Sequence, residues 1–433
     1  MRMKFISLAM LWPLVVVQAQ TNSVPVAESL TLEQAYDRAL ASDQTIRIAY
    51  AEIQKANLLP WSALARQGPR VLGNASYAKP ERAIPSASLL ETRSADLTVE
   101  LPLIDFTVFP AYRGGKLSAQ SARLAQRFTV RGVLFGVTTA YYDVLKQQRV
   151  VEVNRQTLGL ARGQFDLAEK RFNVGDVVKT DVLRARVTVE RALRTLTESE
   201  NALRLARSVL ASILNLGTEP PLVLIDPPSY PASTESLESL QRRAGTGRED
   251  LQVAVLVVET TKAHRGEVVA RYGPRVVAQW SNVWIDPPTD SQPNNFWQAT
   301  VAVQMPFFEG GQRELDLQRV GREVTQSELT RENLAKSIAV DVKAAWLLVH
   351  SLEQTLTALH AEVAAADENY RSLENQYRAG TATSLDVQDA LRDLNTARTD
   401  LAVQTYGYQL ALRDLERVTG VFQQPRVEKV KQP

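Results

Sequence analysis

Apolar side chains in the second half of the chain recur at alternating steps of four and three residues. The positions are Leu352, Leu356, Leu359, Val363, Ala366, Tyr370, Leu373 and Tyr377. This spacing is typical of a helix that packs in a coiled coil. Because no proline interrupts residues 311–378, the pattern predicts one helix roughly 100 Å long at about 1.5 Å per residue.

The first half carries a weaker version of the same pattern. Its positions are Val151, Asn154, Leu158, Ala161, Phe165, Ala168 and Phe172. It predicts a second long helix over about 114–172, roughly 90 Å in length. Four shorter helices are expected over about 31–57, 179–216, 236–269 and 383–419. Stacked end to end, the two short helices of each half match the length of its long helix.

A period of two residues replaces the helical pattern between the first short helix and the long helix of each half. The apolar positions of one such segment are Trp297, Ala299, Val301, Val303 and Met305, with polar residues between most of them. This alternation predicts a strand with one apolar face. The predicted β-hairpins lie near 70–104 and 275–306. Strands of about 9 to 11 residues suit a tilted crossing of a lipid bilayer.

The second hairpin contains three tryptophans, Trp280, Trp284 and Trp297. Their amphipathic rings are expected at the interfaces between lipid and water. A soluble hairpin with an exposed aromatic cluster is the alternative.

Short motifs return at a constant offset of 205 residues. Gly68-Pro69-Arg70-Val71 returns as Gly273-Pro274-Arg275-Val276, and Gly175 returns as Gly380. The constant register predicts an internal duplication. The expected parts of a single domain, 20–433, are repeat one (31–217), a proline-rich connector (218–235), repeat two (236–420) and a tail (421–433).

The N-terminus and the composition restrict where the protein works. Residues 1–19 combine Arg2 and Lys4 with an apolar run and Ala19 at the cut, the pattern of a signal peptide. The formal net charge of +2 and the absence of cysteine argue against nucleic-acid binding, disulfides, thiolate metal sites and lipidation at a cysteine. No later segment has about 18 consecutive apolar residues, so a membrane crossing would need strands.

The number of strands predicts oligomerisation. Four strands per chain leave open edges that cannot face hydrocarbon, because their N–H and C=O groups would be unpaired. Two chains would give an eight-stranded barrel filled by side chains, whereas three give twelve strands and a lumen. We therefore expect an α+β membrane protein, a trimeric twelve-stranded β-barrel continued by a long α-helical coiled-coil barrel.

Three motifs carry a resemblance to a known family. They are Arg171-Phe172-Asn173-Val174-Gly175 with Thr180-Asp181-Val182, Tyr377-Arg378-Ala379-Gly380-Thr381 with Asp386-Val387, and Met305-Pro306-Phe307-Phe308-Glu309-Gly310-Gly311. The chain resembles the TolC-type outer-membrane efflux proteins. The resemblance implies a homotrimeric channel-tunnel without cofactors in the outer membrane of a Gram-negative bacterium. It also implies a periplasmic helical barrel that opens when an adaptor and an inner-membrane pump dock.

The resemblance also implies a gate at the periplasmic end. It places Asp386 and Asp389 in rings of acidic side chains, where mutual repulsion would raise their pKa values. A three-residue step puts both on one helical face. The alternative is a structural role, since Asp386 follows Thr383 at the spacing of a helix cap.

The closed state of the family is tied by bonds between its hairpins, and Tyr377, Thr180 and Asp181 occupy the matching positions. Ala382 stands where the family pattern has an arginine, so Lys179 or Arg184 is a candidate replacement. Gly175 and Gly380 are expected at adaptor-docking tips. Their alternative role is that of turns needing positive φ.

Catalysis has little support in the sequence. His264, His350 and His360 occur singly, and there is neither a phosphate-binding glycine loop nor a zinc-protease motif. No catalytic, metal or cofactor residue is therefore expected. A periplasmic coiled-coil adaptor without a pore is the second functional hypothesis.

Overall fold

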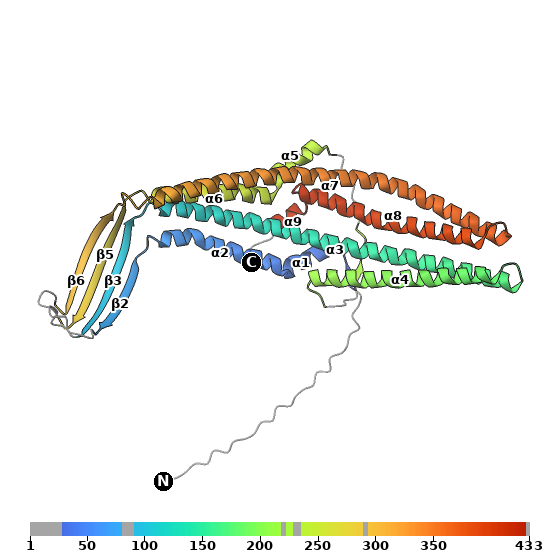
Figure 1. Cartoon of the computed structure of the whole chain (residues 1–433), viewed down its shortest axis with the longest axis horizontal. Helices are drawn as coiled ribbons and strands as arrows, with labels where there is room; N and C mark the ends of the chain where they lie inside the picture. The colour runs from blue at the N-terminus through green and yellow to red at the C-terminus, as the bar shows by residue number, and fades with distance from the viewer. Residues whose placement is uncertain (1–27, 80–90, 218–221, 228–234, 289–292, 430–433) are drawn as a thin grey trace, which may run out of the picture.

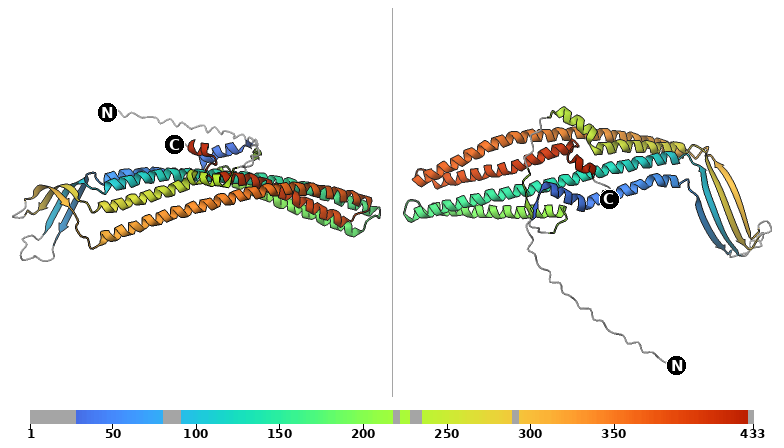
Figure 2. Two further views of the ribbon diagram at one scale, coloured as in Figure 1. Left: turned by 90° about the horizontal axis from the view of Figure 1, so that it is seen from above. Right: turned by 180° about the vertical axis from the view of Figure 1, so that it is seen from behind.

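The computed structural model describes residues 28–79, 91–217, 222–227, 235–288 and 293–429. The predicted signal peptide and parts of the predicted connector and tail lie outside these residues. The chain is elongated, with a β-sheet at one end and long helices that run away from it (Figure 1). Seen from above, the long helices form a thin layer (Figure 2).

Two long helices are present where the apolar periodicity predicts them. They are α3 (Val108–Asn173), with 66 residues, and α7 (Gln312–Ala379), with 68 residues. Each ends in a turn whose glycine has a positive φ, +85° at Gly175 and +82° at Gly380. The chain then returns along α4 (Lys179–Ile213) or α8 (Ser384–Val418), each of 35 residues.

The other two predicted helices are each divided, so the expectation of single helices is wrong. The pieces are α1 (Leu32–Ser42) with α2 (Gln44–Ala65), and α5 (Leu237–Gly247) with α6 (Glu249–Ala270). Asp43 and Arg248, at the two breaks, have extended backbones. The Asp43 carboxylate accepts hydrogen bonds from the first N–H groups of α2, which favours a new helix start.

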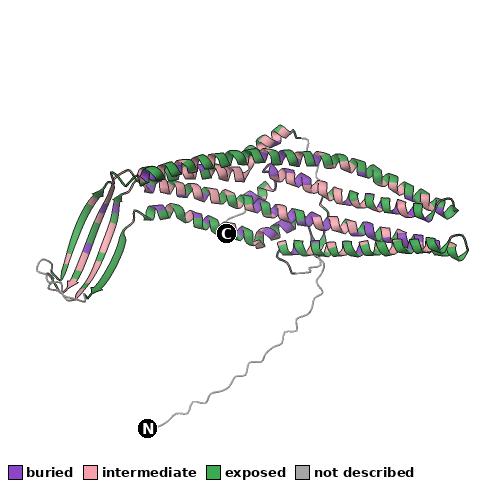
Figure 3. Ribbon diagram, viewed as in Figure 1, coloured by how far each residue is buried: buried purple, intermediate pink, exposed green. Residues whose placement is uncertain are grey.

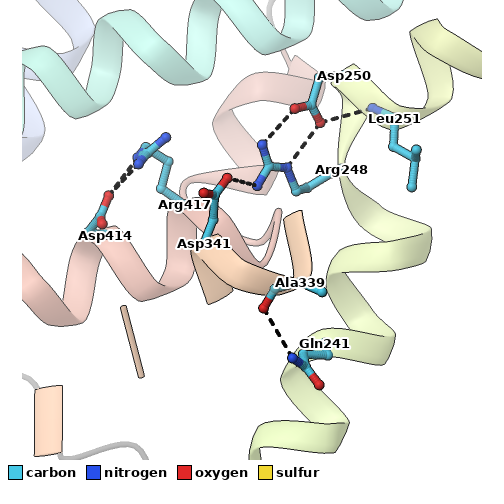
Figure 4. Close-up of polar contacts among 8 residues, drawn as sticks. All are labelled: Gln241, Arg248, Asp250, Leu251, Ala339, Asp341, Asp414 and Arg417. Carbon is cyan, nitrogen blue, oxygen red and sulfur yellow. Dashed lines mark hydrogen bonds and ion pairs between the residues drawn. The ribbon is translucent and has the colours of Figure 1, made fainter. Parts of the chain in front are cut away.

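The second break is held by side chains from two helices. Arg248 donates two hydrogen bonds to Asp250, of 3.0 and 2.6 Å, and lies 3.4 Å from Asp341 on α7 (Figure 4). Gln241 on α5 donates to the carbonyl of Ala339 on α7 (Figure 4). These contacts direct α5 away from the axis of α6.

Four strands form one antiparallel sheet in the order β2-β3-β5-β6. Their bounds are Arg70–Ala78, Thr92–Ile104, Arg275–Asp286 and Asn295–Gln304. A second, parallel pair joins β1 (Glu28–Leu30) to β4 (Leu222–Leu224). β4 lies within the proline-rich connector, where the sequence pattern predicts no strand, so the prediction is corrected there. The Tyr141 hydroxyl holds this pair, because it lies 2.8 Å from the Leu30 carbonyl and accepts from the Ile225 N–H at 3.1 Å.

The core lies near the middle of the molecule, whereas most of the sheet is exposed (Figure 3). Tyr36, Tyr141 and Phe422 are fully buried there. Phe422 precedes α9 (Gln424–Lys429), and Arg426 on α9 forms an ion pair with Glu33 on α1. None of the helices in the described ranges combines the length and apolarity needed to cross a membrane.

Candidate functional site

The register of the sheet separates its side chains into an apolar and a polar face. Val99 lies opposite Trp280, and Ala95 opposite Trp284. Asn282 lies opposite Trp297, and since side chains alternate along a strand, all three tryptophans share one face. That face carries the exposed residues Val71, Tyr77, Leu97, Leu101, Trp280, Trp284, Trp297, Val301 and Val303.

Side-chain hydrogen bonds join β2 and β3 on the opposite face. Asn74 donates to Asp96 at 3.0 Å, and the Ser76 and Ser94 hydroxyls lie 2.8 Å apart. On β5 and β6 the same face carries Gln279, Gln298 and Thr300, so the middle of the sheet has one apolar and one polar face.

The edges of the sheet continue into the edges of the helical layer. In the half near the sheet, α3 and α6 lie between α2 and α7; in the far half, α3 and α8 lie between α4 and α7 (Figure 1). One edge of the chain is therefore β6 followed by α7. The other is β2 with α2 and α4 stacked end to end.

The two hairpin tips meet at Arg171 and Tyr377. Arg171, near the end of α3, donates to the carbonyl of Tyr377 near the end of α7. Its guanidinium lies over the Tyr377 ring, 4.9 Å from the centroid, an arrangement that attracts a cation. Tyr377 is 3% exposed, and burial raises the pKa of its hydroxyl, with Arg171 acting in the opposite direction.

Among the other expected inter-hairpin residues, Asp181 acts on Tyr377 through its charge, which also raises the pKa of the Tyr377 hydroxyl. Within the described residues, the buried Tyr377 hydroxyl has no hydrogen-bond partner. Thr180 is exposed, and Asp181 lies 3.9 Å from Arg184 on its own helix. Sequence reasoning gave Arg171 no role. A difference between the two repeats could have drawn attention to Arg171. Its counterpart at the 205-residue offset is Gln376, so only one tip has a cation at this position.

Asp386 caps α8 within one chain. Its carboxylate accepts from the Thr383 hydroxyl at 2.6 Å and from the Thr383 N–H at 2.9 Å, and its own N–H donates back to Thr383. These bonds, the hydroxyl first, lower the pKa of Asp386. Repulsion in a ring of carboxylates would raise this pKa instead. Such a ring needs Asp386 side chains from several copies of the chain.

Asp389 lies one turn further along α8 and forms an ion pair with Arg392. Both line a cavity of about 300 Å³ between α4 and α8. Arg184 and Arg191 line it from α4. Among the residues that the structure describes, no cluster of His, Asp and Glu could hold a metal ion.

These features define a class of elongated protein in which an amphipathic four-stranded sheet continues into two long helical hairpins. Two segments, residues 35–216 and 240–421, match the family model described as outer membrane efflux protein. The chain therefore belongs to the outer membrane efflux protein family, which is a family of efflux proteins and not of enzymes.

Relatives and solved structures agree with this assignment. The outer membrane protein TolC of Vibrio cholerae is 24% identical over 69% of this chain and 70% of its own length. The alkaline protease secretion protein AprF of Pseudomonas aeruginosa is 23% identical over 77% and 71%. The fold matches the VceC outer membrane protein of Vibrio cholerae, with a TM-score of 0.76, 17% identity and coverage of 90% and 96%. It also matches the CmeC channel of Campylobacter jejuni, with a TM-score of 0.78, 13% identity and coverage of 93% and 89%.

Proposed function

We propose that three copies of this chain form a channel-tunnel, the outer-membrane part of a tripartite efflux or type I secretion system. The observation that carries the proposal is the pair of unpaired edges along the chain. Strand edges in lipid need partners, and pairing β6 of one copy with β2 of the next closes a sheet. Three copies give twelve strands and leave a lumen, whereas two would fill the barrel with side chains.

Pairing β6 of one copy with β2 of the next also brings α7 of the first copy against α2 and α4 of the second. Exposed apolar residues on α4 support this contact, among them Leu183, Val187 and Leu205. α4 carries three more basic than acidic residues, whereas residues 345–379 of α7 carry three more acidic than basic ones. Opposite charges therefore face each other between copies.

The apolar face of the sheet would contact outer-membrane lipid, with Trp280, Trp284 and Trp297 near its interfaces. The helices would extend into the periplasm and end at Gly175 and Gly380. Relatives such as AprF are named for secretion, and in this assembly an adaptor and an inner-membrane pump would dock at these tips. The periplasmic-adaptor alternative is less well supported, because it gives the four-stranded amphipathic sheet no role.

Cross-linking tests this assembly cleanly, because the chain has no cysteine. Val187→Cys on α4 is combined in turn with Ala364→Cys, Glu368→Cys or Arg371→Cys on α7. Membranes carrying each pair are treated with a short bis-maleimide, and we expect covalent ladders that end at three chains. Each single-cysteine variant is the control. A soluble periplasmic chain, or ladders absent for every pair, would contradict the proposal.

A further inference from the structure

Three kinds of interaction converge on the Arg171 guanidinium. It donates to the last-turn carbonyl of Tyr377 and lies over that residue's ring. It also lies 3.9 Å from Asp176 in its own turn, and its side chain is 17% exposed. A cation at the C-terminal end of a helix is favoured by the helix dipole, so Arg171 suits the end of α7 particularly well.

The backbone of the second tip lies close to this cation. A Cβ added at Gly380 would lie 3.6 Å from Nη2 of Arg171. The carbonyl that Arg171 contacts also accepts from the Gly380 N–H at 3.1 Å. The guanidinium therefore packs against the turn that ends α7. It links two helical hairpins that are far apart in the sequence.

The arrangement is not repeated at the other tip. The counterparts of Arg171 and Tyr377 at the 205-residue offset are Gln376 and Phe172. Phe172 is 41% exposed, whereas Tyr377 is 3% exposed. One aromatic ring is thus covered by an arginine and the other is left open.

We infer that Arg171 is the positioning residue that holds the two hairpin tips of one chain together in the resting channel, through the ring and carbonyl of Tyr377 and not through its hydroxyl. This inference rests on the proposed channel function. The family pattern has an arginine where this chain has Ala382, in the second tip. Arg171 on α3 supplies a cation in its place. Separation of the tips would break the hydrogen bond, uncover the ring and expose the end of α7, so the contact opposes opening.

Single-channel recording of the purified full-length protein in planar bilayers, without pump or adaptor, tests this role. Arg171→Gln loses the charge-assisted hydrogen bond to the Tyr377 carbonyl and should raise the fraction of time in the open level about ten-fold. Tyr377→Leu keeps that carbonyl but loses the ring beneath the guanidinium, and should raise the fraction about three-fold, the effect of one lost cation–π contact. Tyr377→Phe keeps the ring and carbonyl and should behave as wild type. Arg171→Lys keeps the charge and should restore closure in part.

The matched control is Arg378→Gln. Arg378 lies next to Tyr377, but its side chain is 59% exposed and pairs with Glu374 on the same helix. Its loss should leave open occupancy unchanged, and thermal unfolding should show that all five variants are folded. Wild-type occupancy in folded Arg171→Gln or Tyr377→Leu would overturn the inference. So would equal opening by Tyr377→Phe and Tyr377→Leu, because it would assign the tie to the hydroxyl.

A second readout separates this inference from the channel function itself. Spin labels on Val174→Cys and Ala379→Cys report the distance between tips, with labelled chains diluted into unlabelled ones. Arg171→Gln should broaden this distribution and Arg378→Gln should not. A wild-type protein that gives no conductance would contradict the channel, whereas an unchanged distance distribution in Arg171→Gln would contradict the tie.

Discussion

Arg131 on α3 and Glu249 in the first turn of α6 form a buried, two-bond ion pair. The Nε–Oε2 distance is 3.2 Å and the Nη2–Oε1 distance is 2.5 Å, while Nη1 donates to the Phe422 carbonyl at 2.6 Å. The side chains are 4% and 10% exposed. One arginine therefore joins the first half of the chain, the second half and the C-terminal segment.

Breaking this pair should destabilise the middle of the molecule. Glu249→Gln leaves Arg131 buried without its carboxylate and should lower the free energy of unfolding by about 3–5 kcal/mol. Replacing both partners with apolar residues, in Arg131→Met with Glu249→Leu, should cost less, because no charge stays buried alone. Urea unfolding measures the free energy of unfolding of the single and the double variant. A double variant less stable than Glu249→Gln would show that the Phe422 contact matters more than the pair.

The apolar face of the sheet can be tested one residue at a time. Val301→Lys or Val303→Lys should cost about 2–4 kcal/mol if this face meets the bilayer midplane, and should reduce assembly in the outer membrane. Thr300→Lys is the matched control, because Thr300 occupies the polar face of the same strand. Heat-resistant oligomer in membrane extracts is the measurement. Normal assembly of both valine variants would refute the lipid-facing assignment.

The glycine tips offer a separate test of adaptor docking. Gly175→Val and Gly380→Val place a branched side chain at a positive φ and add bulk where a partner would dock. We expect efflux to be lost while the oligomer still assembles. Gly159→Ala, in an open position on α3, should leave efflux intact. Unchanged efflux in the double valine variant would exclude the tips from docking.

The gate and cap roles of Asp386 can be separated with Thr383. Asp386→Asn combined with Asp389→Asn should abolish cation selectivity and block by multivalent cations, because the carboxylate charge is lost. Thr383→Ala removes the cap hydroxyl but keeps both carboxylates, so selectivity should survive. Bilayer recordings compare the two. Wild-type selectivity in the double asparagine variant would show that these residues are not the gate.

The pH dependence of the cap has a definite sign. Because Thr383 lowers the pKa of Asp386, the cap stabilises α8 above the unfolded-state pKa and is lost as the pH falls through the lowered folded value. Thermal unfolding across acidic pH should show this loss in the wild type and a weaker one in Thr383→Ala. An equal loss in both proteins would contradict it.

Much of the fold was predictable because it depends on short-range patterns. The steps of four and three residues define α3 and α7, the alternation after Asn295 defines β6, and the glycines define the tips. The two family matches begin 205 residues apart, the same offset as the repeated motifs, which supports the predicted duplication. Each of these features is set by neighbours along one helix, strand or turn.

The sequence by itself thus determined the lengths of the long helices, the amphipathic strands and the family. Only the tertiary structure decided that Arg248 contacts Asp341 at the break between α5 and α6, that β4 pairs with β1, and that Arg171 contacts Tyr377. These contacts join residues far apart in sequence, and no local period specifies their partners. Their geometry depends on how the helices pack, which brings one arginine against the end of a helix some two hundred residues away.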